Sequence, residues 1–432
     1  GANFSADDVI YTLNLIKNPV VSSPLISTWQ DINVKKNGDL EIIFELPRPY
    51  SSFPFTMTFG ILPNHILKDV APDQIRNFVI ENRMNVVGTG DFKFYRQDEN
   101  TETGQTTWYF TGIDGRTHVK NLDIKTYADS ESALVGFENG EVNAVTGLSI
   151  NEIEKAQKMS DVKILQVPVD DGVFALFNNS GQFTSNKNIR EALRYAVDRA
   201  ELRKNQKFES EPLETPIMTG VIGEVDSLKQ PDFNLEEAGK KLDEAGWVLG
   251  ENGQRTKDGV QLELNVVTVK GADYEPTAEF LAESWRKLGV KVNFIAADPA
   301  TFQIDYLATH NYDVLVYQLH LGADPDVSPY WLTSTAENGL NFANYKSKIN
   351  DLNLTNAKTE TNASKQAARY ADFVKQWISD APAIALYQPK IYYLSRSGNQ
   401  SFSDDYKLVS LAYRFYDARS WSVSTGEFMI TP

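Results

Sequence analysis

Two carboxylates follow an apolar stretch and precede bulky aromatic residues, a pattern that could recognise a cation. The stretch YDVLVYQLHLGADPDVSPYW covers residues 312–331, in which Asp324 and Asp326 flank a proline. Ligands of open α/β sheets bind beyond the carboxyl ends of strands, so a carboxylate here could meet a positively charged group. Asp326 could instead cap a short helix beginning near Val327, with Pro325 fixing the turn. Both interpretations can hold, with Asp326 capping and Asp324 facing a cleft.

The same two acids could alternatively form the acid pair of a hydrolase. The carboxyl groups of a glycosidase stand roughly 5–10 Å apart and normally come from different elements. No second convergent catalytic group accompanies the acids, although His320 ends the preceding strand and could line the same cleft. The four histidines are scattered without an HExxH pair, and no GxSxG motif occurs. We therefore expect no catalytic residues, no metal and no cofactor.

Composition restricts the classes of partner. The net charge of −16 disfavours nucleic acid, whose phosphates need a surface rich in Lys and Arg. The absence of cysteine excludes disulfides, thiolate nucleophiles and cysteine-ligated metals. No run of 18 apolar residues is present to span a membrane. At 432 residues, the chain exceeds the roughly 250–300 residues at which a single core stops growing, so we expect two or three domains.

The elements that would position these acids alternate between helix and strand. Alternating patterns of this kind predict α/β layers with parallel strand pairing. The predicted strands of the second half of the chain are 172–183, 260–269, 290–298, 312–320 and 382–395, and the predicted helices are 185–202, 234–247, 277–289 and 364–381. No linker rich in Pro, Gly or Ser separates the halves, which suggests that the chain crosses between domains on short strands.

The chain opens on a helical pattern and not on a leader. Ser5 can cap this helix with Asp8 three residues on, and Val9, Leu13 and Ile16 share one face. The first residues carry neither a basic nor an apolar leader region, so we expect no signal peptide in this sequence. The opening looks like the middle of a domain, and we expect the sequence to be truncated at its N-terminus.

Six segments together carry a resemblance. They are NFSADDVIYTLNLIKNP (3–19), VVGTGDFKF (86–94), ALVGFENGEVNAV (133–145), FALFNNSGQFTSNKNIREALRYAVDRAEL (174–202), FNLEEAGKKLDEAGW (233–247) and GADPDVSPYW (322–331). In this order they resemble motifs of the extracellular solute-binding proteins of family 5, the peptide/nickel class that feeds ABC importers. Asp91 stands at the usual proline position of the family, and Asn143 replaces an aspartate. These departures leave the substrate open.

The resemblance implies a two-lobed α/β fold of the type II periplasmic-binding-protein class with crossover hinge strands. Lobe I would hold residues 1–170, with a small subdomain at 1–87 and its N-terminal part missing, and 387–432. Lobe II would hold residues 171–386. The hinge strands would lie near VFALFNN (173–179) and AIALYQPK (383–390).

The resemblance also implies a ligand site. In peptide-binding members an acid after this lobe II strand pairs with the α-amino group of the ligand, and Asp324 occupies the matching place. The pairing is physically sound, because a buried ammonium needs an anionic partner to offset its desolvation. The other ligand contacts that we expect are Gly322, Tyr330, Trp331 and Asn341 on the pocket wall, and Phe177, Asn178 and Tyr387 near the hinge.

The implied function is that of the substrate-binding component of an ABC importer, which captures oligopeptides between two lobes and delivers them to a membrane permease. It would act as a monomer, without enzymatic activity, at the periplasmic or extracellular face of the membrane, and carry a lipid anchor in its full-length form. Three alternatives stay open: a hydrolase using Asp324 and Asp326, a binder of another small solute such as a nickel chelate, an opine or a sugar, and a sensor or chaperone-like module of the same fold.

Overall fold

The computed structural model describes residues 2–81, 87–218, 220–322, 324–337, 339–400 and 411–423. The chain divides into two compact units. Unit 1 comprises Gly1–Leu165, Tyr392–Asp405 and Ala412–Pro432, and unit 2 comprises Gln166–Ile391 and Tyr406–Leu411. The chain passes from one unit to the other within β7 (Val162–Pro168) and β16 (Ala383–Arg396). The expected crossover segments at 173–179 and 383–390 both lie inside unit 2, and the second belongs to β16, the strand that continues into unit 1 at Tyr392.

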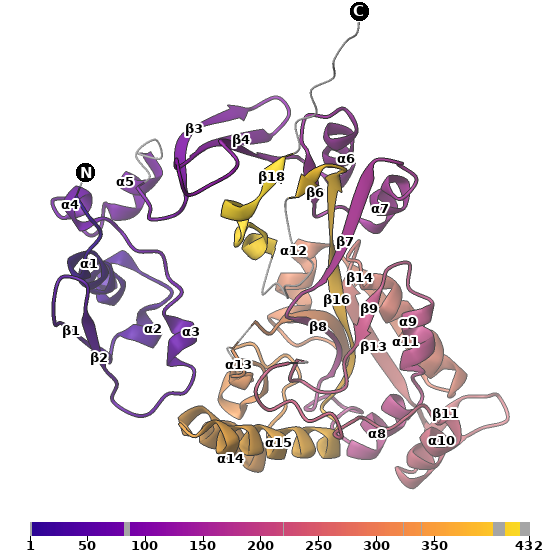
Figure 1. Cartoon of the computed structure of the whole chain (residues 1–432). Helices are drawn as coiled ribbons and strands as arrows, with labels where there is room; N and C mark the ends of the chain where they lie inside the picture. Colours follow the sequence, from indigo (N-terminus) through magenta and orange to yellow (C-terminus); the bar gives the residue numbers. More distant parts are fainter. Residues whose placement is uncertain are drawn as a thin grey trace, which may run out of the picture. The chain divides into compact units, whose positions relative to one another are not determined.

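Unit 1 combines short helices with small antiparallel sheets (Figure 1). Its helices are α1 (Ala6–Lys17), α2 (Ile26–Trp29), α3 (Phe53–Thr56), α4 (Asn64–Leu67), α5 (Ile75–Glu81), α6 (Ser130–Glu138) and α7 (Ile150–Ala156). Its strands are β1 (Asn33–Lys36), β2 (Ile42–Glu45), β3 (Phe92–Asn100), β4 (Gln105–Gly112), β5 (Asn121–Thr126), β6 (Ala144–Thr146), β17 (Asn399–Gln400) and β18 (Ser422–Val423).

Helix α1 begins as the sequence predicts. Asp8 accepts the backbone N–H of Ser5 at 2.8 Å, which satisfies a donor at the helix start. Val9, Leu13 and Ile16 are buried on one face and form a small core with Trp29 and other apolar residues of unit 1. The periodicity of the apolar residues therefore identified both the helix and its buried face.

Unit 2 is built around one mixed sheet. The strands of unit 2 are β8 (Asp171–Phe177), β9 (Ser210–Pro212), β10 (Val248–Leu249), β11 (Arg255–Lys257), β12 (Val260–Gln261), β13 (Glu263–Val269), β14 (Lys291–Ala297) and β15 (Val314–His320), of which β10, β11 and β12 form a small sheet of their own. Its helices are α8 (Lys187–Tyr195), α9 (Arg199–Lys204), α10 (Leu235–Glu244), α11 (Glu275–Lys287), α12 (Pro299–Thr301), α13 (Ser328–Trp331), α14 (Lys348–Thr359) and α15 (Ala363–Asp380). The sheet order is β14-β13-β15-β8-β16.

The expectation of parallel pairing is right for only part of this sheet. Strand β13 pairs in parallel with β14 and β15, as helical crossovers require. Strand β8 is antiparallel to both β15 and β16. Alternation of helix and strand along the chain does not reveal the direction of a strand that enters the sheet from another unit, so this part of the prediction was wrong.

Both faces of the sheet are buried, which explains the continuous apolar runs of its strands. Along β8, Val173, Ala175 and Phe177 pack on one face with residues of α8, α10 and α11. Phe174 and Leu176 pack on the opposite face with residues of α13, α14 and α15. Figure 1 shows α14 and α15 side by side. The central strands are therefore held rigidly between two helical layers.

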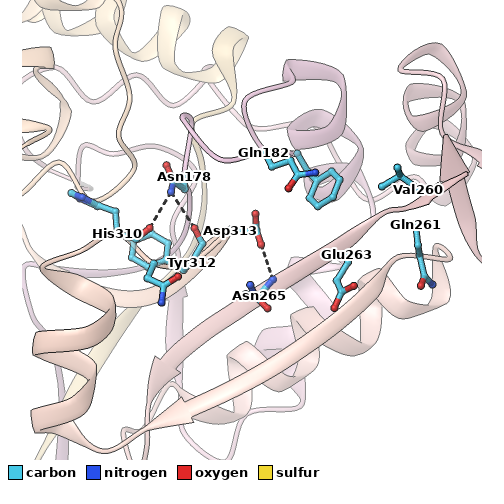
Figure 2. Close-up of a pocket in the computed structure, with 11 residues that line it drawn as sticks. Asn178, Gln182, Val260, Gln261, Glu263, Asn265, His310, Tyr312 and Asp313 are labelled. Carbon is cyan, nitrogen blue, oxygen red and sulfur yellow. Dashed lines mark hydrogen bonds between the residues drawn. The ribbon is translucent and has the colours of Figure 1, made fainter. Parts of the chain in front are cut away.

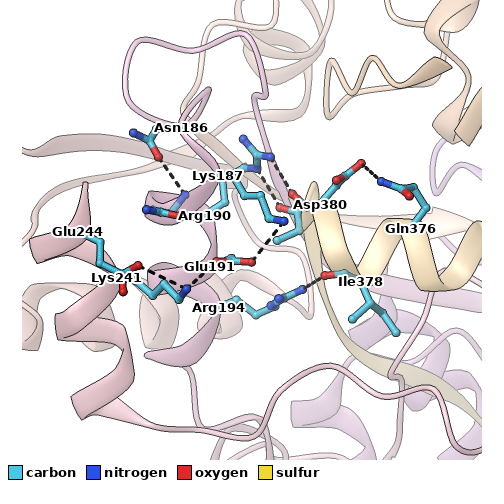
Figure 3. A network of polar contacts seen from close by, with 12 residues as sticks. Asn186, Lys187, Arg190, Glu191, Arg194, Lys241, Glu244, Gln376, Ile378 and Asp380 are labelled. Atoms are coloured by element: carbon cyan, nitrogen blue, oxygen red, sulfur yellow. Dashed lines mark hydrogen bonds and ion pairs between the residues drawn. The ribbon is translucent and has the colours of Figure 1, made fainter. Parts of the chain in front are cut away.

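Two arginines of α8 cap the end of α15 (Figure 3). Arg190 donates from Nε to the carbonyl of Ala381 at 3.0 Å and from Nη2 to that of Asp380 at 2.7 Å. Arg194 donates to the carbonyl of Ile378 at 2.7 Å. The last carbonyls of a helix lack internal partners and carry partial negative charge, which a guanidinium satisfies. The segment 174–202, which resembles the family signature, therefore fixes the point where β16 begins.

The predicted helix 185–202 is interrupted in the structure. Helix α8 ends at Tyr195, and a second helix, α9, begins at Arg199. Asp198 caps this second helix by accepting the backbone N–H of Glu201 at 2.9 Å. The apolar periodicity continues across the break because Ala196 and Val197 are also buried. A cap signal inside one periodic run is therefore what divides the segment into two helices.

Candidate functional site

The carboxyl end of β15 is tied to the beginning of β8. His320, the last residue of β15, lies opposite Asp171, the first residue of β8. The Asp171 carboxylate lies 2.5 Å from Nδ1 of His320 and accepts a hydrogen bond from Nε2 of Gln318 at 2.7 Å. Side chains of both strands are therefore hydrogen-bonded to one another at the end of the sheet where the carboxyl end of β15 lies, which is where the sequence predicted a ligand site.

Backbone hydrogen bonds continue this pairing past the end of the strand. The carbonyl of Asp170 accepts the N–H groups of Leu321 and Gly322 at 2.9 and 3.0 Å. Gly322 has a φ of +70°, in the left-handed region that favours glycine. A Cβ at this position would meet no atom within 4 Å, so backbone conformation, and not lack of space, selects glycine here. The backbone at Leu321 and Gly322 is thus fixed to the core sheet.

The two acids of the opening motif have different surroundings. The side chain of Asp326 is 5% exposed, forms an ion pair with Lys358 at 2.8 Å, and accepts the N–H of Ser328, the first residue of α13, at 3.0 Å. Asp324 is partly exposed, and its Oδ1 accepts the N–H of Asp326 at 3.0 Å. The expectation that Asp326 is the N-cap of the short helix is right only in part: Asp326 accepts the first N–H of α13, but the residue at the N-cap position is Val327. The Asp326 side chain is committed to structure, and as whole residues both acids have intermediate exposure.

Tyr330 joins α13 to the end of β15. Its hydroxyl donates to the carbonyl of His320 at 2.5 Å. Burial, and next the negative charge of Asp171, raise the pKa of Tyr330 to about 12. The phenol is therefore neutral at physiological pH and acts as a donor that holds the helix against the strand end. Gly322, Asp324 and Tyr330 are the predicted site residues that the structure brings to this edge.

Four of the other predicted ligand contacts lie in the interior: Phe177, Trp331, Asn341 and Tyr387 are 0–1% exposed. The Trp331 ring packs edge-on against Trp377 with ring centroids 5.6 Å apart. Asn341 donates to the carbonyls of Leu332 and Tyr345 at 2.9 Å. In this structure these side chains lie in the core and do not form an exposed wall, because side chains beside a strand end can equally face the layer beneath it. Phe177 also pairs with Val314, at the start of β15 and away from Asp324.

Asn178 lies at the other end of the sheet. Since β8 and β15 are antiparallel, the residue after β8 faces the beginning of β15, away from Asp324. The side chain of Asn178 donates to the carbonyls of His310 and Tyr312, both at 3.1 Å, which precede β15. The structure therefore does not bring Asn178 together with Asp324. The prediction that both contact the ligand did not take this into account, because the sequence did not reveal the antiparallel register.

Sequence reasoning did not name Asp170 or Asp171. Consecutive acids directly before an apolar strand were the only available signal. Their partner His320 is 149 residues away along the chain, and no spacing rule links the two. Carboxylates from two strands thus gather at one sheet edge, an arrangement that suits a ligand bearing a positive charge. Among the described residues, no cluster of three or more His, Cys, Asp or Glu side chains is suited to hold a metal ion.

Comparison with known proteins shows which family the sequence of this chain resembles. The family model for bacterial extracellular solute-binding proteins, family 5 Middle, matches residues 1–341. The oligopeptide-binding protein AppA of Bacillus subtilis is 24% identical over 403 residues, which cover 90% of this chain and 73% of that protein. The oligopeptide-binding protein OppA of Lactococcus lactis subsp. cremoris is 25% identical over 342 residues, covering 71% of this chain and 55% of that protein.

Solved structures resemble the chain over nearly its whole length. NikZ from Campylobacter jejuni, in complex with Ni(L-His), has a TM-score of 0.79 at 22% identity and covers 98% of this chain and 85% of its own. AppA from Bacillus subtilis, in complex with a nonapeptide, has a TM-score of 0.74 at 22% identity, covering 98% and 84%. The expected two-lobed α/β fold is confirmed. Because the family model matches well over half of its residues, the chain belongs to the bacterial extracellular solute-binding proteins of family 5.

Proposed function

We propose that the chain is the substrate-binding component of an ABC importer, which captures oligopeptides and delivers them to a membrane permease. The observation that carries the proposal is the position of Asp324, a partly exposed acid beyond the carboxyl end of β15 and two residues after Gly322, whose N–H donates to the carbonyl of Asp170. Relatives named as oligopeptide-binding proteins support the peptide as ligand. No helix among the described residues is long and apolar enough to cross a membrane.

Asp324 would act as the counter-ion of the peptide α-amino group. An ammonium that leaves water needs an anionic partner, since its desolvation is otherwise uncompensated. Asp326 is unsuited to this role because Lys358 already neutralises it. That ion pair also weighs against a hydrolase, in which both acids would need access to the substrate. We further propose that the protein acts as a monomer at the outer face of the cell membrane, anchored by lipid in its full-length form.

The ligand is identified first and the amine contact is tested second. Mass spectrometry of the purified protein under denaturing conditions should reveal bound peptides. A peptide found in this way, or a pool of random nonapeptides if none is found, is then prepared with a free and with an acetylated N-terminus. Recovery of a nickel chelate, an opine or a sugar in place of peptides would transfer the proposal to that solute class.

The decisive variant is Asp324→Asn, which removes the charge and keeps the size of the side chain. By calorimetry we expect the affinity for the free peptide to fall more than about tenfold, equivalent to about 1.4 kcal/mol, and the affinity for the acetylated peptide to change little. Asp305→Asn, an exposed acid before β15, is the control for loss of one negative charge. Equal losses for both peptides would contradict the amine contact.

A further inference from the structure

A polar pocket lies at the end of β15 opposite to Asp324. Asp313 directly precedes β15, whereas Asp324 follows it, and the strand has seven residues, which span about 23 Å. The pocket has a volume of about 540 Å³, within the range of about 300–1,000 Å³ that is common for small-molecule sites. All of its lining residues belong to unit 2. The pocket is therefore separate from the proposed peptide site, which lies at the carboxyl end of β15.

Three connections of the sheet build this pocket (Figure 2). The chain after β8, the start of β13 and the loop before β15 contribute Asn178, Gln182, Glu263, Asn265, His310 and Asp313. The side chain of Asn178 binds two carbonyls of the loop, and Oδ2 of Asp313 accepts the N–H of Asn265 at 2.8 Å. These bonds fix the walls, so a ligand would meet a preformed site with little ordering to pay for.

Asp313 supplies negative charge without a cationic neighbour. Glu263, on the same wall, is paired with Lys291 at 3.0 Å, but no ion pair of the described residues includes Asp313. Burial raises the pKa of Asp313, the hydrogen bond from the Asn265 N–H opposes this effect, and the charge of Glu263 adds to it, so the net result disfavours the ionised form. In Figure 2 its carboxylate lies between Gln182 and Asn265.

The remaining polar groups of the pocket can accept and donate further hydrogen bonds. The Gln182 carboxamide is exposed where it lines the pocket, and Nε2 of Gln261 is buried without a hydrogen-bond partner among the described residues. Two carboxylates disfavour an anion, the carboxamides disfavour an apolar molecule, and the described residues offer no metal-binding cluster. A cation that also carries hydrogen-bonding groups suits all three conditions.

We propose that this pocket binds a small organic cation, an ammonium or guanidinium compound with additional hydrogen-bond donors, with Asp313 as its counter-ion and Gln182 as a hydrogen-bonding partner. The site goes beyond the proposed peptide site, since it uses other residues at the opposite sheet edge. Charge pairing with a poorly compensated carboxylate supplies the attraction, and the carboxamides select molecules that carry donors. Binding would stabilise unit 2 whether or not a peptide is present.

The chain has only four histidines, so their ring signals in NMR spectra can be used to locate the binding site. His310 lines the pocket, whereas His320 ends β15 at the opposite edge. L-argininamide, which carries two cationic groups and no carboxylate, is titrated while the histidine ring signals are followed by NMR, assigned through His310→Gln and His320→Gln. We expect a saturable shift of the His310 signal with a Kd of about 1 mM or below and an unchanged His320 signal.

Two variants make the test selective. Asp313→Asn keeps an acceptor for the Asn265 N–H and should weaken argininamide binding at least tenfold, whereas Asp324→Asn should bind it like the parent. Gln182→Glu adds a further negative charge to the wall and should tighten binding, which keeps the test open if Asp313→Asn fails to fold. Lack of saturable binding at about 10 mM, tenfold above the expected limit, would overturn the proposal. So would a shift at His320 in place of His310, or equal affinities of parent and Asp313→Asn.

Discussion

Replacement of Arg190 by methionine should destabilise unit 2 strongly. The side chain is 6% exposed and donates four hydrogen bonds, to the carbonyls of Thr184, Ser185, Asp380 and Ala381, at 2.7–3.0 Å. Methionine has a similar volume and no donor, so these carbonyls would remain without their partner. The substitution therefore isolates the polar contribution of the residue from its packing.

The magnitude follows from the number of bonds. A hydrogen bond to a charged group contributes roughly 1.5–3 kcal/mol, so four such bonds give about 6 kcal/mol at the lower limit. Burial lowers the pKa of Arg190, which shows that desolvation of the guanidinium opposes its charge, and loss of the charge relieves that penalty. We expect a net loss of about 3 kcal/mol. For a unit of this size, that loss corresponds to a fall of about 6–12 °C in Tm.

The measurement combines calorimetry with hydrogen exchange. The thermogram of Arg190→Met should show an earlier transition of unit 2, and amides at the start of β16 should exchange faster, because Arg190 holds the carbonyls just before that strand. Arg190→Lys keeps the charge without the planar fork and should lie between parent and methionine variant. Arg369→Met, on the exposed side of α15, is the matched control and should leave Tm unchanged within about 2 °C.

The reasoning would be refuted if Arg190→Met and Arg369→Met had the same Tm. It would also be refuted if Tm fell without faster exchange at the start of β16, because the loss would then arise elsewhere. In either case the arginines of α8 would have a role other than capping the end of α15.

Two further predictions concern the motif at the end of β15. Lys358→Met should lower the free energy of unfolding by about 1–2 kcal/mol, because it leaves the buried Asp326 carboxylate without its cation; Asp326→Asn in the same chain should restore part of the loss in a double-mutant cycle. Tyr330 should make stability fall between about pH 10 and pH 12, because the unfolded phenol loses its proton near pH 10 while the folded one keeps it to about pH 12. Tyr330→Phe should reduce that slope by up to one proton, as measured by unfolding titrations at each pH; an unchanged slope would show that the hydroxyl is not protected.

The sequence allowed the local elements of unit 2 to be predicted, because their periodicity is imposed by burial. Ile189 and Leu193 of α8 were expected on an apolar face, and both are buried in the core. Asp326 was expected to cap a helix, which depends only on residues two positions away. Apolar faces and helix caps depend on residues close together in the chain, so a short segment of sequence is enough to predict them.

Features that depend on distant partners could not be read in this way. Arg190 lies outside the apolar face of α8 that the sequence predicts, yet it is buried. The end of α15, 190 residues further along the chain, provides the carbonyl groups to which Arg190 donates. Trp331 was expected on a pocket wall, but the layer of α15 places Trp377 beneath it. In both cases the side chain permitted two environments, and a segment far away in the chain decided between them.

The acids around β15 show how the fold assigns different tasks to one residue type. Asp326 lies where α14 can reach it, and Lys358 neutralises it. Asp324 stands only two residues earlier and follows Gly322, whose backbone N–H donates to the carbonyl of Asp170 at 3.0 Å. A charge held in this way needs little ordering when a cation arrives, which leaves more of the interaction energy for affinity. If Asp324 binds the ligand amine, weakening the tie at Gly322, for example by Gly322→Ala at its φ of +70°, should therefore reduce affinity even though no contact with the ligand is removed.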